Sequence, residues 1–275
     1  GDPEKGTSGW CSRAWRARTA TRPSACISGE DADAYHVEKF EDTIRELERG
    51  QADYAVLPIE NSTAGFVITN YDLLSRYDNY IVGEIYVPVD HVLLGVPGAS
   101  VSDVKTVYSH NQALMQCSEY LDSHGDWNQV SVVKYGGCRQ KRSWRKGIRP
   151  RQPWPAVPPE SFTALRSLRT SISNERGNTT RFLVLSREPV YEKKASKVTV
   201  TFEVPHVSGS LYKILGNFIF NGVNMRMIES RPIPDKPFEY RFFVDIEGNL
   251  SHAPVHNALA GIQAEASSMK ILGNY

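Results

Sequence analysis

Cysteine is scarce in this chain, and long apolar runs are missing from it. The four cysteines, Cys11, Cys26, Cys117 and Cys138, show no paired C-x-x-C spacing, which argues against a zinc site and against a disulfide framework. No run reaches the roughly 18 apolar residues of a transmembrane helix, and no charged-then-apolar N-terminal stretch indicates secretion. We therefore expect a cytoplasmic protein with no membrane partner.

An excess of charge of either sign is also missing. The 275 residues hold 32 basic and 31 acidic side chains, so no overall field would draw the chain to nucleic acid or to a membrane surface. The length suits one large domain or two ordinary ones. The sequence opens at Gly1 rather than at Met, as expected of a fragment, a processed product or a piece of a longer polypeptide.

Between residues 37 and 135, helical and strand patterns alternate. Val37–Arg49 is typical of an amphipathic helix with Phe40, Ile44 and Leu47 on one face, and Gly50 ends it. Alternating elements of this kind predict an α/β lobe with a largely parallel sheet. The other expected elements are strands at 52–59, 80–87, 91–96, 104–108 and 130–135, and helices at 71–76 and 112–121.

The C-terminal part has the clearest pattern, which predicts the ferredoxin-like order βαββαβ. Its elements are a strand at 198–204, a helix at 209–220, strands at 224–230 and 239–246, a helix at 253–266 and a strand at 269–272. The polar segment 188–197 contains Pro189 and is the expected linker. We therefore expect one domain over residues 1–188 and a second over residues 195–275.

Two turns rich in hydrogen-bonding side chains follow expected strands. In the string LPIENSTAG, Ser62, Thr63 and free backbone N–H groups are suited to a carboxylate. In YSHNQA, Ser109, His110 and Gln112 repeat the arrangement after a later strand. A helix cap explains one such turn equally well, and a lone histidine is more often a cap than a catalyst. Two turns at equivalent strand ends indicate a shared ligand cleft.

A third cluster is Asn178–Phe182, directly before the apolar run Leu183–Leu185. An arginine beside two hydroxyls can hold a carboxylate while a hydroxyl reaches the reacting atom. As a bare motif it is explained more simply by a turn leading into an edge strand.

Taken in order, the strings PIENSTAG, YSHNQAL and NTTRFLVL resemble prephenate dehydratase, and SGSLYKIL and IESRP resemble the two effector-site motifs of its ACT domain. The resemblance covers roughly residues 30–135 and 173–275. It implies a two-lobed α/β domain, similar to periplasmic binding proteins, with the active site between its lobes, followed by a ferredoxin-like ACT domain. The implied reaction converts prephenate to phenylpyruvate with loss of CO2 and water, under feedback control by L-phenylalanine. The family is often fused to a chorismate mutase domain.

The resemblance also implies roles for individual residues. Thr180 is the candidate for protonating or orienting the leaving hydroxyl, and Arg181 would anchor a carboxylate. No metal or redox cofactor is needed, because loss of carboxylate and hydroxyl together makes the ring aromatic. The implied substrate-binding set is Glu60, Asn61, Ser62, Thr63, Ser109, His110, Gln112, Arg181 and Phe182.

In the ACT domain, the resemblance implies a phenylalanine site. Gly209 and Ser210 open a helix whose N–H groups would receive the ligand's carboxylate, and Leu211, Met227 and Ile228 are expected to line the ring pocket. The other implied effector residues are Glu229, Ser230, Arg231 and Pro232. The simpler alternative is a tight turn beside a charged strand end. Because a βαββαβ unit alone leaves a sheet face and an edge strand exposed, we expect a homodimer or homotetramer.

Two stretches of the lyase part lack the family pattern. They hold Trp10, Trp15, Trp144 and Trp154, four of the five tryptophans, with many arginines and almost no acid. Back-translating Trp10–Gly29 and reading two bases later permits VLTGMEGAYSHAAFGMHFG, which contains the family's missing G-x-x-G-A-Y-S motif. The same offset over 140–170 permits an acidic, helix-periodic segment, and the prolines at 150, 153, 155, 158 and 159 exclude a continuous helix in the printed frame. We interpret residues 10–29 and 136–172 as frame-shifted.

Two functions therefore stay open: an active prephenate dehydratase, and a catalytically inactive remnant of the same family that binds phenylalanine. A solute-binding domain of similar architecture is disfavoured by the absent signal peptide and by the TRF string. A nucleic-acid binder is the weakest alternative.

Overall fold

The computed structural model describes residues 9–13, 33–37, 39–132, 165–190 and 192–275. It divides into two compact units, one holding residues 88–178 and the other holding residues 7–87 and 179–275. Most of the two stretches interpreted as frame-shifted lies outside the described residues.

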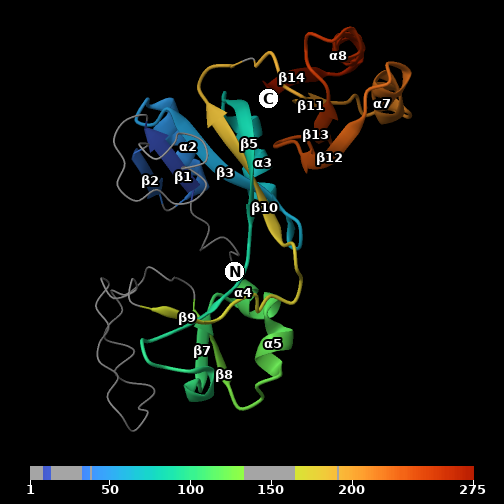
Figure 1. Ribbon diagram of the computed structural model, residues 1–275. Coiled ribbons are helices and arrows are strands. Elements are labelled where there is room, and N and C mark those ends of the chain that lie inside the picture. The colour runs from blue at the N-terminus through green and yellow to red at the C-terminus, as the bar shows by residue number, and fades with distance from the viewer. Residues whose placement is uncertain (1–8, 14–32, 38, 133–164, 191) are drawn as a thin grey trace. The chain divides into compact units, whose positions relative to one another are not determined.

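The larger unit is built on one mixed sheet (Figure 1). Its strand order is β12-β13-β11-β14-β5-β10-β3-β1-β2, with β4 paired to β3. Strand β10 begins directly after residue 178 and pairs with β3, so that segments far apart in the chain become neighbours in the sheet. The strands of its α/β part are β1 Gly9–Arg13, β2 Asp33–Val37, β3 Tyr54–Asn61, β4 Gly65–Phe66, β5 Tyr80–Pro88 and β10 Thr179–Ser186.

The expectation of a largely parallel sheet is wrong for this unit. Strand β3 pairs antiparallel with β1, β4 and β10, and β1 pairs antiparallel with β2. Parallel neighbours need a crossover connection, whereas β4 follows β3 through a short turn and β10 arrives from a distant part of the chain. Local periodicity predicts a strand, but it does not say which strands become neighbours.

Two helices complete the core of this α/β part. Helix α2, Phe40–Glu48, buries Phe40, Ile44 and Leu47, as the amphipathic pattern predicts. Helix α3, Ile68–Arg76, buries Tyr71 and Leu74. Their apolar side chains pack with those of β3, β5 and β10 in one continuous cluster. These contacts hold β3, β5 and β10 in place, while the end of β3 and the beginning of β10 carry the polar motifs.

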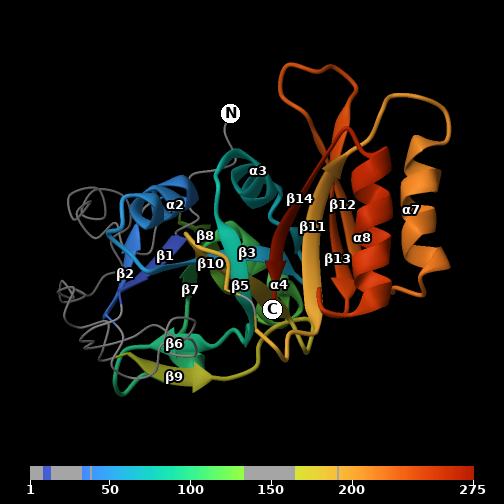
Figure 2. The same ribbon diagram turned by 90° about the horizontal axis from the view of Figure 1, so that it is seen from above.

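The C-terminal part has the predicted βαββαβ order. Helices α7 and α8 cover one face of its four strands, as Figure 2 shows, and close a core around Phe202, Ile214 and Phe218. The elements are β11 Lys197–Glu203, α7 Ser210–Phe220, β12 Met225–Pro232, β13 Tyr240–Glu247, α8 Ala253–Glu265 and β14 Ser268–Asn274. The expected linker, 188–197, lies between β10 and β11, within the larger unit.

The second face of this four-stranded part is covered within the same chain. Phe243 and Leu272 are fully buried in the cluster that also contains Tyr71 and Leu74 of helix α3. Strand β14 runs parallel to β5 at Gly273 and Ile81, and a Cβ on Gly273 would clash with the carbonyl oxygen of Ile81. The face that a βαββαβ unit alone would leave exposed is therefore covered, and among the described strands of this part only the edge of β12 remains open.

The smaller unit contains the parallel pair β7 Thr106–Ser109 and β8 Asn128–Ser131, joined by the helices α4 Asn111–Gln116 and α5 Ser118–Asp122. The predicted single helix at 112–121 is interrupted at Cys117, whose φ and ψ are −119° and 12°. Leu114, Leu121 and Trp127 are buried in its core. The remaining elements are β6 Leu93–Gly95, β9 Arg166–Arg169 and the 3-10 turn Val101–Asp103.

None of the helices among the described residues is both long and apolar enough to cross a lipid bilayer.

Candidate functional site

Two of the three sequence motifs meet in the larger unit. Strands β3 and β10 pair so that Thr180 lies opposite Asn61 and Arg181 lies opposite Glu60. The NTTRF string is therefore the beginning of a strand, and β10 lies between β3 and β5 rather than at an edge. Residues that are more than a hundred positions apart in the chain come into direct contact at this place.

Asn61 orients the hydroxyl of Thr180. Its side-chain Oδ1 accepts hydrogen bonds from the backbone N–H of Thr63 at 3.0 Å and of Ala64 at 2.8 Å. Both donors are N–H groups, so the oxygen of the amide must face them and the Nδ2 must face the other way. That Nδ2 donates to Thr180 Oγ1 across 2.9 Å. Because Thr180 Oγ1 is the acceptor, the hydroxyl proton is directed elsewhere.

The backbone N–H groups of this turn are not available to a ligand, in contrast to the expectation. Ser62 N–H donates to the carbonyl of Thr179 at 2.9 Å, and the N–H groups of Thr63 and Ala64 are engaged by Asn61. The Ser62 hydroxyl accepts from Thr179 N–H at 2.9 Å. The turn is also no helix cap, since α3 begins at Ile68 and Val67 is its N-cap residue. Its hydrogen bonds serve to tie β3 to the beginning of β10.

Arg181 lies on the opposite face from Thr180, because successive side chains of a strand alternate. Its guanidinium is bonded to Glu84 of β5 at 2.7 Å and to Asp245 of β13 at 2.5 Å. Glu60 is on the same face, 3.8 Å from the guanidinium. The geometry corrects the expectation for Arg181 and Glu60. Arg181 is bound by Asp245, Glu84 and Glu60 of this chain, and neither Arg181 nor Glu60 shares a face with Thr180. Phe182 follows a register shift and is half-buried opposite Pro58.

Burial by itself would lower the pKa of Arg181, but the carboxylates of Asp245 and Glu84 outweigh burial and raise it. Burial and Asp245 both raise the pKa of the neighbouring Tyr275 hydroxyl. Arg181 is therefore charged and Tyr275 neutral at any physiological pH. Asp245 and Glu84 were not identified from the sequence. The signal that marks each of them is an acid placed between apolar neighbours inside a strand, as in VGEI of β5 and FVDI of β13.

The remaining motif, YSHNQA at residues 108–113, lies in the smaller unit. Ser109 ends β7, and its carbonyl accepts from Val132 N–H at 2.9 Å. His110 is the N-cap of α4, and its Nδ1 accepts from Gln112 N–H at 3.3 Å. The capping role that the sequence allowed for His110 is confirmed. Substrate binding by Ser109, His110 and Gln112 stays a prediction.

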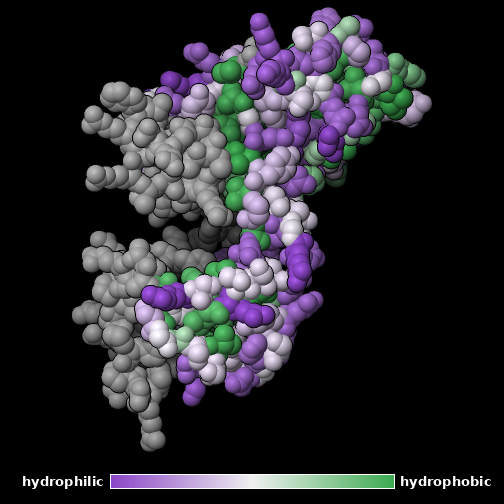
Figure 3. Space-filling model, in the orientation of Figure 1, coloured by the Kyte–Doolittle hydropathy of each residue, from purple (hydrophilic) through white to green (hydrophobic). Residues whose placement is uncertain are grey.

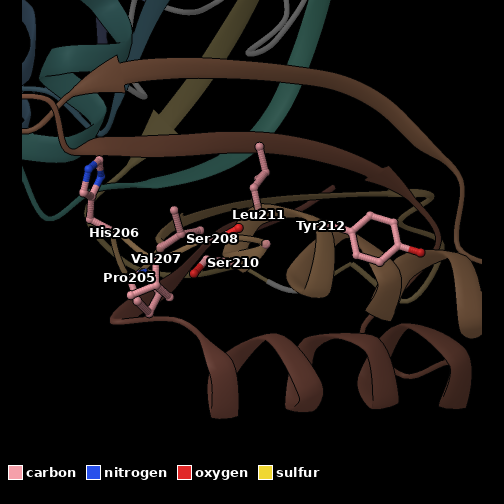
Figure 4. A pocket seen from close by; sticks show the side chains of 9 residues that line it. Pro205, His206, Val207, Ser208, Ser210, Leu211 and Tyr212 are labelled. Carbon is pink, nitrogen blue, oxygen red and sulfur yellow. The ribbon is translucent and has the colours of Figure 1, made fainter.

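A hollow of about 410 Å³ lies at the start of α7 in the C-terminal part (Figure 4). It is lined by residues 204–212, which run from the end of β11 into the first turn of the helix. Gly209 is the N-cap residue with φ of +81°, a conformation that glycine adopts readily and other residues do not. Gly209, Ser210 and Leu211 thus lie at one hollow, as the resemblance implies.

The second effector motif, IESRP at residues 228–232, belongs to β12, and its side chains lie on both faces of that strand. Arg231 points to helix α3 and forms a bidentate ion pair with Asp72, with distances of 2.8 Å and 2.7 Å. Met227 is on the same face and accepts a hydrogen bond from Tyr71, so it does not line a pocket with Leu211, which packs in the core under the helices. Ser230 and Pro232 are exposed, and Glu229 is half-buried.

No group of three or more His, Cys, Asp or Glu side chains suited to a metal ion occurs within the described part of the chain.

Comparison with known proteins places the chain among dehydratases. A protein from Arabidopsis thaliana named arogenate dehydratase/prephenate dehydratase 1, chloroplastic, is 35% identical over 86% of this chain and 64% of its own length. The bifunctional chorismate mutase/prephenate dehydratase of Escherichia coli is 34% identical over 86% of this chain and 62% of its own length. The chain thus spans less than two thirds of these relatives.

Solved structures agree with this similarity. A prephenate dehydratase from Arthrobacter aurescens, solved in complex with L-Phe, is 29% identical, with a TM-score of 0.71 over 86% of this chain and 78% of that one. A structure described as GqqA, a novel type of quorum quenching acylase, has the same identity and TM-score over 86% of each chain. The family model of prephenate dehydratase matches residues 17–190, well over half of the sequence, and it includes both strands that bring Asn61 and Thr180 together. The chain belongs to the prephenate dehydratase family.

Proposed function

We propose that this chain is a dehydratase that converts prephenate to phenylpyruvate. The ring carboxylate leaves as CO2 with its bonding electrons remaining in the ring, and the ring hydroxyl takes up one proton and leaves as water. The observation that carries the proposal is the hydrogen bond from Asn61 Nδ2 to Thr180 Oγ1 at 2.9 Å. It occupies one lone pair of the threonine hydroxyl and leaves the hydroxyl proton for donation to another group.

The chemistry requires a donor at the leaving oxygen. A hydroxyl has one proton and two lone pairs, and in Thr180 one lone pair is used by Asn61, so the proton can point toward an acceptor. Hydrogen bonding to the leaving oxygen stabilises the charge that develops as its bond to carbon breaks. Thr180 supplies this interaction, while Asn61, Ser62 and Thr63 hold the strand end on which it is presented. Ser109, His110, Gln112 and Phe182 are further substrate-binding candidates.

Arogenate is the competing substrate, because several curated relatives are named arogenate dehydratases. Arogenate carries an amino group where prephenate carries a keto group, and its dehydration yields phenylalanine rather than phenylpyruvate. Incubating the full chain with each substrate and measuring both products distinguishes the two. We expect phenylpyruvate from prephenate, and absence of both products would overturn the proposed function.

The second candidate function, an inactive phenylalanine-binding remnant, is favoured by the two stretches that lack the family pattern, 10–29 and 136–172. It predicts phenylalanine binding without either product. The nucleotide sequence of the gene separates a sequencing error from a decayed reading frame. A version of the chain with both frames restored then reports the activity of the intact lyase part.

We infer that the C-terminal βαββαβ part is an ACT domain that binds L-phenylalanine in the hollow at residues 204–212. Its helix α7 begins at Ser210, and the first turn of a helix presents N–H groups that suit a carboxylate. The Arthrobacter aurescens relative was solved with L-Phe. The effector residues are Gly209, Ser210 and Leu211, with Glu229, Ser230 and Pro232 from β12, whereas Arg231 links the site to helix α3.

Calorimetric titration of the full chain with L-phenylalanine tests this site. Gly209→Ala should abolish the heat of binding, because an added Cβ lies where the ligand's carboxylate approaches the helix end. Gly222→Ala is the matched control, since Gly222 also has a positive φ, of +65°, and also has no atom within 4 Å of an added Cβ. It lies at the far end of α7, so binding should be retained. Equal loss in both variants would show a folding effect and would remove the site.

We also propose that the C-terminal part pairs with a second copy of the chain. Helix α7 exposes Tyr212, Ile219 and Phe220, at 77%, 66% and 84%, and Ile228 is exposed on the open edge strand β12. Figure 3 shows apolar surface gathered at the end of this part where α7 lies. Apolar side chains beside an unpaired strand edge are the usual features of an interface. Phe220→Arg should yield a monomer in sedimentation, whereas Val190→Arg, at an exposed linker position, should not.

A further inference from the structure

A cluster of charged side chains is buried where β5, β10 and β13 come together in the larger unit. Arg181 and Asp245 are 7% and 1% exposed, and their side chains are 2.5 Å apart. The Nε of Arg181 donates to Glu84 Oε2 at 2.7 Å. One strand of the C-terminal βαββαβ part and two strands of the α/β part therefore share a single buried guanidinium.

Each carboxylate oxygen of Glu84 and Asp245 has a partner. Lys197 Nζ donates to Glu84 Oε1 at 2.6 Å, and Thr199 Oγ1 donates to Asp245 Oδ1 at 2.6 Å. Arg181 also donates to the hydroxyl of Tyr275 at 3.3 Å. Two cations, Arg181 and Lys197, thus face the carboxylates of Glu84 and Asp245, with the more exposed Glu60 as a third carboxylate 3.8 Å from Arg181. The hydrogen bonds fix these side chains in one arrangement. A fully satisfied network of this kind is rigid, whereas loss of one member leaves a buried charge without its partner.

The cluster is one residue away from the proposed site of reaction. Arg181 follows Thr180 directly, and the two side chains point to opposite faces of β10. A register shift between Arg181 and Phe182 interrupts the pairing with β3 just beyond them, and such a bulge increases the local twist of a strand. A change in how the Arg181 side chain is held would therefore act on the short strand end that also carries Thr180.

We propose that Asp245 is a positioning residue for the reaction at Thr180, acting through Arg181. It rests on the function proposed above for Thr180. Asp245 fixes the guanidinium, the guanidinium fixes the twist of the strand end 179–181, and the strand end directs the Thr180 hydroxyl. The Thr180 hydroxyl is then correctly directed only while the C-terminal βαββαβ part is packed against the α/β part.

Two other ion pairs join the same parts of the unit without touching β10. Arg231 is paired with Asp72 of helix α3, and Lys270 is paired with Asp78. Asp72→Asn also removes an ion pair between the C-terminal part and the α/β part, although this pair is more exposed than that of Arg181 and Asp245. It is therefore the matched control for Asp245→Asn, since it separates an effect on Thr180 from a general loosening of the packing.

The first measurement is amide hydrogen exchange on the full chain. Asp245→Asn should speed exchange at Ser62 and at residues 179–181 by about tenfold or more, whereas Asp72→Asn should leave these amides within about twofold of the parent. Thr199→Val, which removes a donor to Asp245 without changing the charge, should act in the same direction and more weakly. Unchanged exchange at these amides in both Asp245→Asn and Thr199→Val would overturn the proposal.

The second measurement is steady-state kinetics with prephenate. Asp245→Asn should lower kcat about tenfold or more with KM within about twofold, because orientation of Thr180 matters in the transition state and not in binding. Asp72→Asn should leave kcat unchanged. A fall in kcat of equal size in both variants would overturn the proposal. If the parent chain forms no product, the proposed function fails, and hydrogen exchange still decides whether Asp245 holds the strand end.

Discussion

The side-chain amide of Asn61 donates to the hydroxyl oxygen of Thr180 across 2.9 Å, while its carbonyl oxygen is held by two backbone N–H groups. The pair joins β3 and β10 at the point where both carry motif residues. Because Asn61 is the donor in this hydrogen bond, the Thr180 hydroxyl can donate its proton to another group. Replacing the Nδ2 of Asn61 with an oxygen atom would reverse the direction of the bond.

Asn61→Asp keeps the shape of the side chain and its acceptor for Thr63 and Ala64, but places a second acceptor against Thr180. The Thr180 hydroxyl should then donate to the new carboxylate and be lost to the substrate. We expect kcat for prephenate to fall about 10²-fold in a version of the chain with both reading frames restored. A kcat close to that of the parent in this variant would show that the direction of the hydroxyl is irrelevant.

Thr180→Val removes the hydroxyl and retains the branched shape. Because the hydroxyl acts on the leaving oxygen in the transition state, kcat should fall about 10²- to 10⁴-fold, with a much smaller change in KM. Thr180→Ser keeps the hydroxyl and is the control, so its kcat should stay well above that of the valine variant. The frame-restored chain is again the background, with phenylpyruvate formation as the assay. Turnover within a few fold of the parent in Thr180→Val would remove Thr180 from the mechanism.

Gly273→Ala should separate β14 from β5. An added Cβ would clash with the carbonyl oxygen of Ile81, which is backbone and cannot move aside as a side chain can. Overpacking of this kind costs about 1–3 kcal/mol of the free energy of unfolding, measured by denaturant titration. Gly125→Ala is the control, because a Cβ there has no neighbour within 4 Å and the backbone φ is unremarkable. Equal stability of the two variants would show that the two strands do not approach as closely as this.

Acid should weaken the end of β11 beside the hollow at Gly209. Burial alone would raise the pKa of Glu203, but Arg241 and Lys236 outweigh burial and lower it below its ordinary value of 4.5. A carboxylate whose folded pKa is depressed stabilises the fold above its unfolded pKa, and that contribution is lost as pH falls through the folded value. Arg241→Gln removes the main cause of the shift. The variant's free energy of unfolding should therefore depend less steeply on pH below 4.5 than that of the parent, and parallel curves would contradict this assignment.

Elements of secondary structure are predicted well from the sequence, because each depends on contacts between near neighbours. The amphipathic pattern of 37–49 and the βαββαβ order of the C-terminal part both agree with the structure within a few residues. The chemistry proposed for Thr180 and for the hollow at Gly209 was also identified through motifs, since hydroxyls, amides and glycine have the same capabilities wherever they lie. The single helix predicted at 112–121 is wrong at Cys117, where the backbone leaves the helical region.

The partners of these residues were decided by the tertiary structure. Asn61 and Thr180 are 119 positions apart, and nothing in either segment states that β10 returns to lie between β3 and β5. Strand alternation separates two sets of side chains, but only the packed sheet determines that Thr180 shares its face with Asn61 while Arg181 faces Asp245 and Glu84. An acid between apolar neighbours in a strand indicates a buried partner, but it does not indicate which residue that partner is. The sequence by itself thus determined the elements and the reactive groups, whereas long-range pairing and burial decided which groups meet, because those contacts exist only after the chain has folded.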